Sequence, residues 1–469
     1  MRILLINPTT RRYTTNVSIQ AQAPLGLLSL AAVLRSAGHN VKIFDRNVED
    51  GSIKKYLKFE PELVGLTSFT GPMLLDAIYL SSIFRKHLDV PIVWGGIHAS
   101  LLPQQTIENP NIDIVVVGEG EETILELADC IEQGQDLENV QGIYWKKQKN
   151  GTHKIVQNAP RPFIRNLDSL PFPTWDLLDK QKYFKTSLGW NRSSFAFFSI
   201  QSSRGCPYNC GFCYNTVFNK RKWRPKSPER VVEEIAFLKE TYRAKTILFV
   251  DDNFAVSPKR AMKISQGIVK NKLDVNFHID CRVDLLSKQV AKFLRVAGCD
   301  QIYFGIESGS PRILRFINKG ITLKQALHAV RLCRELGIMS STSFIMGFPT
   351  ETIEDIAYTC RFIYQLNPDS LLLKFFVPYP GSPLYNYVIK HNLFSPPAKL
   401  EDWAITWTNI GCQFSKIPPD TLRKLSRRTF RKYFTRRIPK FALIFLLNLL
   451  KKKISPKQML SWGIKNFLM

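Results

Sequence analysis

Short apolar runs alternate with helical patterns through the first 145 residues of this chain. The sequence predicts strands at 3–8, 41–45, 63–68, 91–96 and 112–121. Helical patterns separate them, most clearly at 25–38, 73–87 and 123–134. Strands that read as continuous apolar runs are buried on both faces, as in a parallel sheet covered by helices. The alternation therefore predicts a doubly wound, mostly parallel α/β domain over residues 1–145.

The carboxyl ends of these strands are rich in glycine and small polar residues. They read Asn7-Pro8, Thr67-Ser68, Gly95-Gly96-Ile97-His98 and Gly118-Glu119-Gly120-Glu121. Ligands bind beyond this edge of an open parallel sheet, and glycine lets a bulky ligand approach the backbone. Each turn, taken alone, fits an ordinary strand-to-helix connection equally well. No GxGxxG pattern follows the first strand, so this Rossmann-like domain is not expected to bind a dinucleotide.

Residues 146–190 are expected to form a linker. They contain the polar run KKQKNGTHK and four prolines between positions 160 and 173. Proline fixes one backbone dihedral and removes a hydrogen-bond donor. The segment is therefore predicted to be an irregular strap between two domains.

Three of the nine cysteines are clustered, at Cys206, Cys210 and Cys213, in the spacing CxxxCxxC. Three thiolates on one short loop can converge on a metal centre. A structural zinc site needs four ligands, and the nearest histidines, His153 and His278, are more than 50 residues away. An iron–sulfur cubane held by three thiolates leaves one iron open for a substrate or cofactor. The six scattered cysteines are interpreted as small buried hydrophobic residues.

The triplet, with Phe212 before its third cysteine, resembles the radical S-adenosylmethionine (SAM) superfamily. The barrel of that superfamily matches the pattern around and after the triplet, with strands expected at 199–203, 246–252, 275–281, 301–308, 341–349 and 370–380. Helical segments such as 227–242 and 322–337 separate these strands. The resemblance thus implies a partial TIM-like, six-stranded βα barrel over residues 191–400, with its site at the carboxyl ends of the strands.

The N-terminal domain resembles the cobalamin-binding domain that precedes the barrel in one subgroup of this superfamily. The strings GGIHAS, VVVGEGEET, RNLDSLPFPTWDLLD, GFPTET and PYPGSPLY carry the likeness. The Asp-x-His-x-x-Gly motif that supplies a cobalt ligand elsewhere is absent, so no cobalt ligand is assigned. Cobalamin contacts are expected at the strand ends, from Thr67, Ser68, Gly95, Gly96, His98, Gly118, Glu119 and Gly120.

The same resemblance implies roles for individual barrel residues. Cys206, Cys210 and Cys213 hold a 4Fe–4S cluster whose open iron chelates SAM. Phe212 packs near the adenine, Glu307 bonds the ribose or the amino group, and Arg282 pairs with the methionine carboxylate. Asp251 and its neighbour Asp252 end the second strand and point toward the same site. The alternatives are a helix N-cap for the two aspartates and a surface ion pair for Arg282.

The chain is strongly basic, with 65 Lys+Arg against 39 Asp+Glu. Residues 416–469 hold 15 of these cations and one acid, Asp420, and an apolar run from Phe441 to Leu450 lies between basic clusters. We expect this C-terminal region, 401–469, to be helical. It either lies on an anionic membrane surface or packs back on the barrel, whereas nucleic-acid binding is not expected. Neither a signal peptide nor an 18-residue apolar run is visible, so a cytoplasmic protein is expected.

The resemblance implies a reductive reaction in which one electron cleaves SAM to methionine and a 5′-deoxyadenosyl radical. That radical removes a hydrogen atom, and methylcobalamin then donates a methyl group. We expect a methyltransferase acting on an unactivated carbon or phosphorus, with a hydrophobic substrate such as a lipid or tetrapyrrole, and a ferredoxin or flavodoxin as electron donor. The alternatives are a radical cyclase or rearranging enzyme with the same cofactors, and a non-enzymatic iron–sulfur or nucleic-acid-binding module.

Overall fold

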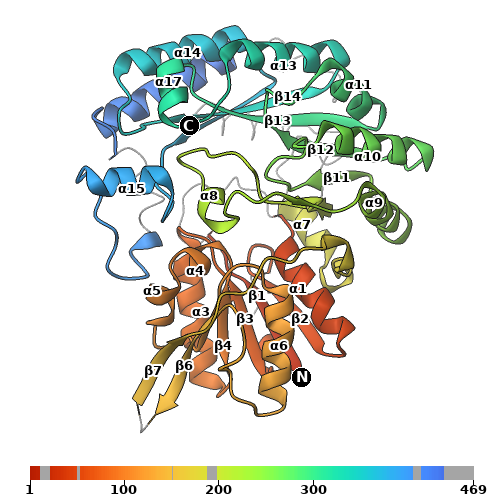
Figure 1. Ribbon diagram of the computed structural model, residues 1–469, viewed down its shortest axis with the longest axis vertical. Coiled ribbons are helices and arrows are strands. Elements are labelled where there is room, and N and C mark those ends of the chain that lie inside the picture. The colour runs from red at the N-terminus through yellow and green to blue at the C-terminus, as the bar shows by residue number, and fades with distance from the viewer. Residues whose placement is uncertain (11–21, 50–52, 150–151, 187–197, 405–413, 438–469) are drawn as a thin grey trace.

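The computed structural model describes residues 1–10, 22–49, 53–149, 152–186, 198–404 and 414–437. Figure 1 shows two α/β units stacked on one another, the N-terminal unit below and the barrel above. The carboxyl ends of the strands in the two sheets meet where the units join, because one cavity is lined by Gly95 from the first sheet and Val250 from the second. The fold thus places both predicted ligand-binding edges at one junction.

The N-terminal unit contains a seven-stranded sheet in the order β2-β1-β3-β4-β5-β6-β7. The first five strands are parallel and follow the predicted runs: β1 (Arg2–Asn7), β2 (Asn40–Asp45), β3 (Leu63–Thr67), β4 (Ile92–Gly95) and β5 (Ile114–Val116). The helices are α1 (Leu25–Ser36), α2 (Lys54–Leu57), α3 (Met73–His87), α4 (Ile97–Leu101), α5 (Pro103–Ile107) and α6 (Glu121–Glu132). The predicted doubly wound domain is confirmed. β2 is added on one side of β1 and β3 to β5 on the other, so the order in which strands are added reverses between β1 and β3.

Strand β1 illustrates why these runs are apolar throughout. Ile3 and Leu5 belong to a core with α1 and α6, whereas Leu4 and Ile6 belong to a second core with α3 and α5. Successive side chains of a strand point to opposite faces, so a sheet covered on both faces needs apolar residues at every position.

Two antiparallel strands extend this sheet beyond the predicted domain boundary at 145. β6 (Ile143–Lys149) pairs with β5, and β7 (Thr152–Gln157) pairs with β6. The polar residues 146–149 and 152–154 are therefore parts of paired strands and not of a linker, which corrects the expectation for 146–190. The rest of that stretch carries only 3₁₀ turns at Leu167–Ser169 and Trp175–Leu177 and the helix α7 (Lys180–Thr186), within the described residues.

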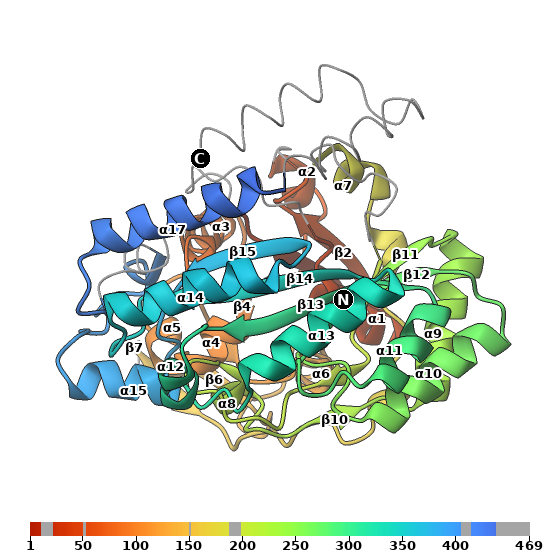
Figure 2. The same ribbon diagram turned by 90° about the horizontal axis from the view of Figure 1, so that it is seen from above.

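The second unit is the predicted six-stranded parallel barrel, in the order β15-β14-β13-β12-β11-β8. Its strands are β8 (Phe198–Ile200), β11 (Thr246–Phe249), β12 (Asn276–Cys281), β13 (Cys299–Glu307), β14 (Met339–Met346) and β15 (Ser370–Phe375). The helices α9 (Pro228–Tyr242), α10 (Pro258–Lys270), α11 (Lys288–Val296), α12 (Pro311–Phe316), α13 (Leu323–Leu336) and α14 (Ile353–Leu366) connect them. Figure 2 shows α9, α10, α11, α13 and α14 along the outside of the sheet.

Side-chain caps fix where the barrel helices begin. Ser227, Ser257, Ser287 and Thr352 each accept a hydrogen bond from a backbone N–H in the first turn of α9, α10, α11 and α14. Each such cap satisfies a donor that the helix leaves open and contributes about 1 kcal/mol. The caps thereby fix the residue at which each of these strand-to-helix loops ends, and such loops form the site.

The C-terminal part returns to the N-terminal unit after α15 (Pro383–Lys390). Leu400 and Trp403 complete the second core of that unit, and the Trp403 indole N–H donates to Gln105 Oε1 at 2.7 Å. The helix α17 (Pro419–Thr435) then packs against α14 and β15. No helix in the described part of the chain is long and apolar enough to cross a membrane. The apolar run 441–450 lies outside the described residues.

Candidate active site

The cysteine loop begins at a backbone turn that only glycine tolerates. Gly205 has φ +80°, and a Cβ there would lie 2.0 Å from the carbonyl oxygen of Lys222. Two backbone hydrogen bonds hold the far end of the loop, because Gly211 N–H donates to Ile317 O and Leu384 N–H donates to Gly211 O, both at 2.8 Å. The loop between β9 (Ser203–Arg204) and α8 (Asn215–Phe218) is thus held against the ends of two later barrel segments.

Cys206, Cys210 and Cys213 are free thiols that line one cavity of about 470 Å³. Among the described residues, no three cysteine, histidine or acidic side chains converge closely enough to hold one metal ion. A cubane does not require such convergence, because each thiolate ligates a different iron. Burial raises the pKa of the Cys213 thiol to about 12, and a coordinating metal deprotonates a thiol outright. The loop therefore fits a 4Fe–4S cluster better than it fits zinc.

The predicted SAM residues Phe212, Arg282 and Glu307 line this same cavity. The Phe212 ring lies beside the ammonium of Lys319, 5.7 Å from ring centroid to Nζ. Arg282 is buried and donates a hydrogen bond to Asp284. Its Cζ lies 3.7 Å from the centroid of the Tyr208 ring, and its Nη1 lies 3.9 Å from Cys210 Sγ. Arg282 is thus not a surface ion pair, and its predicted contact with the SAM carboxylate stays a prediction.

Glu307 occupies a strained position at the end of β13. Its φ is +73°, which is uncommon outside glycine, and the register between β13 and β14 shifts there. Glu307 Oε1 accepts from Lys319 Nζ at 2.9 Å, and both side chains are 8% exposed. Burial works to lower the pKa of Lys319, but the Glu307 carboxylate outweighs it and raises that pKa above its ordinary value. The pair therefore places a fixed ammonium and carboxylate beside Phe212.

Asp251 is not among the residues that line either cavity, and its predicted contact with SAM stays a prediction. Its carboxylate accepts from the backbone N–H of Ser202 at 2.7 Å and from the hydroxyls of Ser202 and Ser203 at 2.6 and 2.5 Å. It thereby holds the segment that follows β8, and Ser257 is the cap of the next helix. Asp252 is the aspartate that reaches the cavity.

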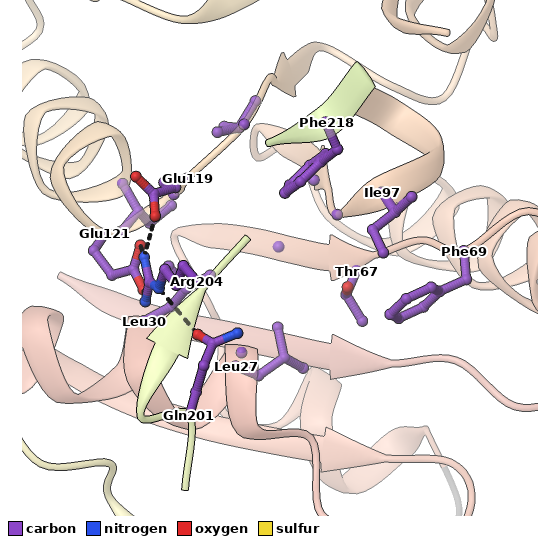
Figure 3. Close-up of a pocket in the computed structure, with 18 of the residues that line it drawn as sticks. Leu27, Leu30, Thr67, Phe69, Ile97, Glu119, Glu121, Gln201, Arg204 and Phe218 are labelled. Atoms are coloured by element: carbon purple, nitrogen blue, oxygen red, sulfur yellow. Dashed lines mark hydrogen bonds and ion pairs between the residues drawn. The ribbon is translucent and has the colours of Figure 1, made fainter. Parts of the chain in front are cut away.

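A second cavity of about 310 Å³ lies between the two units. Of the predicted cobalamin residues, Thr67, Gly95, Gly96, Gly118, Glu119 and Gly120 line it. Barrel side chains contribute to the lining, and Figure 3 shows Gln201, Arg204 and Phe218 around the space together with Leu27, Thr67 and Ile97 of the first unit. The wall is largely apolar, which suits a bulky macrocycle approached through glycine backbone.

Ser68 and His98 do not line the cavity, contrary to expectation. The Ser68 hydroxyl donates to Gly95 O at 2.8 Å within the sheet edge. His98 is fully buried, with Nδ1 3.0 Å from the Thr70 hydroxyl and its ring 6.1 Å from that of Trp403. Burial lowers the pKa of His98 to about 3, so the ring is neutral at physiological pH. Both residues support the turn, and their predicted contacts with cobalamin stay predictions.

Arg204 joins the two units and was not predicted from the sequence. Its guanidinium bonds Glu119 at 2.6 Å and also Glu121 (Figure 3). Arg224 bonds Glu119 as well, at 2.8 Å. Burial tends to raise the pKa of Glu119, but Arg224 and Arg204 together lower it below its ordinary value. Glu119 is therefore an interdomain ion-pair partner at the edge of the cavity.

Several charged residues in the first cavity also have no sequence motif of their own. These are Lys319, Lys374 and Asp280. Burial, with the charges of Asp251 and Asp252, raises the pKa of Asp280 to about 7. The only signal that could have identified Asp280 was its place near the carboxyl end of a barrel strand, where site residues of such barrels lie.

Two known families match the two units. Residues 200–363 match the Radical SAM superfamily, and residues 16–128 match the B12 binding domain. An uncharacterized methyltransferase of Pyrococcus horikoshii is 40% identical over 399 residues, which cover 84% of each chain. The chain belongs to the cobalamin-dependent radical SAM enzymes. Its cofactors are accordingly a 4Fe–4S cluster, SAM and cobalamin.

Other relatives of this radical SAM enzyme differ in their reactions. The anaerobic magnesium-protoporphyrin IX monomethyl ester cyclase of Rubrivivax gelatinosus is 29% identical, over 82% of this chain and 69% of its own. The structure of the radical SAM methyltransferase TsrM from Kitasatospora setae shares the fold, with a TM-score of 0.72 and 20% identity, over 86% of this chain and 82% of its own. The name of the Pyrococcus relative supports methyl transfer as the reaction of this enzyme, the TsrM structure shows that the fold is shared, and the cyclase fits methyl transfer less well.

Proposed function

We propose that this enzyme methylates an unactivated carbon of a hydrophobic substrate, of lipid or tetrapyrrole type. The observation that carries the proposal is that Tyr214 and Asp252 line both cavities. A substrate held at this shared wall faces the cysteine loop on one side and the glycine edge of the first sheet on the other. When bound, the cluster with SAM supplies a hydrogen-abstracting radical, and methylcobalamin supplies a methyl group.

The residues of the chain contribute burial, orientation and exclusion of water. Phe212, Ile345, Phe376 and Val377 form an apolar part of the first cavity, and the Lys319–Glu307 pair forms a polar part. An apolar wall favours a hydrophobic substrate and keeps water away from a reactive radical. A polar group at a fixed position orients what binds beside it. This division of the lining supports a hydrophobic substrate next to a polar cofactor.

Product mass separates methyl transfer from cyclisation. Anaerobically reduced protein, loaded with cluster and cobalamin, is incubated with SAM carrying a deuterated methyl group and with a panel of lipids and tetrapyrroles. A product heavier by one labelled methyl group supports the proposal. A product that has lost hydrogen and gained no label supports an oxidative cyclase, which the similarity to the Rubrivivax cyclase keeps as the second candidate. Protein with Cys206→Ala is the control and yields neither product.

We also propose that the C-terminal region holds the enzyme at an anionic membrane surface. On α17, the side chains of Arg423, Arg427, Arg428 and Arg431 lie toward solvent, while Leu422, Tyr433 and Phe434 pack inward. Each cation near an anionic surface contributes about 1 kcal/mol. Full-length protein is expected to float with phosphatidylserine vesicles and to be released by salt, and R427E/R428E/R431E is expected to bind less. Equal flotation with neutral vesicles would contradict the proposal.

A further inference from the structure

Reduction of the cluster requires an electron from outside the described chain. Among the described residues, no group of cysteine, histidine or acidic side chains is arranged to hold a second metal centre. A radical SAM enzyme consumes one electron in each cleavage of SAM, so a separate donor must approach the cluster loop. The surface nearest that loop is therefore where a donor has to bind.

The segment 220–222 lies directly against the cluster loop. Arg221 Nε donates to the carbonyl oxygen of Pro207, one residue after Cys206, at 3.4 Å. The carbonyl of Lys222 packs against Gly205, and Lys222 N–H donates to Asn219 O at 2.9 Å. The segment is therefore fixed in place beside the first cluster ligand.

Lys220, Arg221 and Lys222 are three consecutive cations at the surface. None of them has a carboxylate within ion-pair distance among the residues that the structure describes. The next cations along the chain differ, because Arg224 is paired with Glu119 and Lys226 with Glu234. Unpaired cations beside a cluster form a positive surface that attracts an acidic protein.

We propose that Lys220, Arg221 and Lys222 form the docking surface for an acidic one-electron donor protein of the flavodoxin or ferredoxin class. The proposal rests on the radical SAM function of this enzyme and names its partner. The reduced cofactor of the donor loses one electron and the cluster held by residues 206–213 gains it, with no bond made or broken. Figure 2 shows α8 and β10 (Arg224–Pro225), which flank this surface, at the edge of the molecule opposite to α17. A donor bound here would leave the membrane-facing region free.

The test measures cluster reduction by stopped-flow absorbance under anaerobic conditions. Cluster-loaded full-length protein is mixed with a flavodoxin hydroquinone at low and at high ionic strength. The variant K220E/R221E/K222E is expected to react at least about tenfold more slowly at low salt, and the difference should shrink as salt rises, because steering between charges is screened. Reduction by dithionite, a small reductant that needs no docking surface, is expected to be unchanged.

A matched variant separates this surface from the overall charge of +26. K288E/K292E/R331E reverses three exposed cations on α11 and α13 and changes net charge equally. Its reduction by flavodoxin is expected to stay within about twofold of wild type. Equal slowing of both variants, or no slowing of either, overturns the proposal. The neutral variant K220Q/R221Q/K222Q, with normal iron content, should give an intermediate rate if folding of the charge-reversed protein is impaired.

None of these rates depends on a substrate. A failure to find a methylated product would leave the reduction rates unaffected, so the docking proposal and the proposed function can fail separately.

Discussion

The hydroxyl of Tyr214 donates to the carboxylate of Asp252 at 3.2 Å, and both side chains line both cavities. Tyr214 directly follows Cys213, a predicted cluster ligand, and Asp252 also accepts from the backbone N–H of Gly205 at 3.1 Å. The wall between the two cavities is therefore attached to both ends of the cluster loop. A shift in that loop would move the boundary between the two cofactors.

Removing the Tyr214 hydroxyl should uncouple SAM cleavage from methyl transfer. We expect Y214F to retain cluster and cobalamin but to form about tenfold less methylated product for each 5′-deoxyadenosine, because small misplacements of reacting groups cost large factors in rate. Chromatography of both products gives the ratio. Ile97→Ala, at a residue that lines the cobalamin cavity and not the first cavity, should change cobalamin affinity instead. An unchanged ratio in Y214F means that the wall has no positioning role.

Alanine at Cys206, Cys210 or Cys213 should abolish cluster binding, since two thiolates do not hold a cubane firmly. Iron content and visible absorbance of the reconstituted proteins provide the measurement. Cys281, Cys299 and Cys333 are buried in the barrel core, so alanine there should cost about 1 kcal/mol of stability and keep the cluster. Loss of the cluster in C281A with retention in C206A would show that the assignment is wrong.

Gly95 is the position at which a bulky residue tests cobalamin binding without disturbing the fold. The atom nearest to a Cβ built at Gly95 is 3.9 Å away, whereas a Cβ at Gly96 would lie 2.7 Å from Ser68 O. We expect Gly95→Leu to weaken cobalamin binding at least about tenfold with an unchanged melting temperature, because the side chain occupies the cavity. Gly96→Ala should lower the melting temperature. Titration with hydroxocobalamin and thermal unfolding distinguish the two effects.

His98 should make the protein less stable as pH falls. Its folded-state pKa is about 3, below the ordinary 6.5, so between these values only the unfolded chain takes up a proton. Stability is therefore complete above about pH 6.5 and falls below it, by at most about 1.4 kcal/mol for each pH unit. His98→Leu should reduce this slope in melting curves from pH 7.5 to 4.5 and keep the cobalamin spectrum. Loss of cobalamin in that variant would restore His98 as a ligand contact.

The sequence predicts the parts of this fold that are buried on both sides. Strands such as β1 and β3 read as apolar runs because helices cover both faces of their sheet. The hairpin β6–β7 was not predicted, because it lies at an edge of the sheet. Consecutive lysine and glutamine residues are tolerated in such a strand and give no apolar pattern. A continuous apolar run is a local signal, whereas pairing at an edge depends on a neighbour that the local pattern does not reveal.

The sequence could predict which side chains meet at the site only where a short spacing brings them together. The triplet at Cys206, Cys210 and Cys213 is such a case. Asp251 and Asp252 are adjacent in sequence. Only the structure shows that Asp251 accepts hydrogen bonds from serine side chains, whereas Asp252 lines the cavities. Lys319 forms an ion pair with Glu307, although a loop and a short helix separate the two residues in the sequence. No local pattern could therefore have predicted this pair.

The bond between Trp403 and Gln105 joins residues 298 positions apart and has a consequence for synthesis. The second core of the N-terminal unit stays open until Leu400 and Trp403 have left the ribosome, by which time the barrel strands have been made. Domains fold as units during synthesis, but a core closed by distant residues is completed late. The packing of the first unit is therefore completed only after the barrel has been synthesised, because two residues of its second core follow the barrel in the chain.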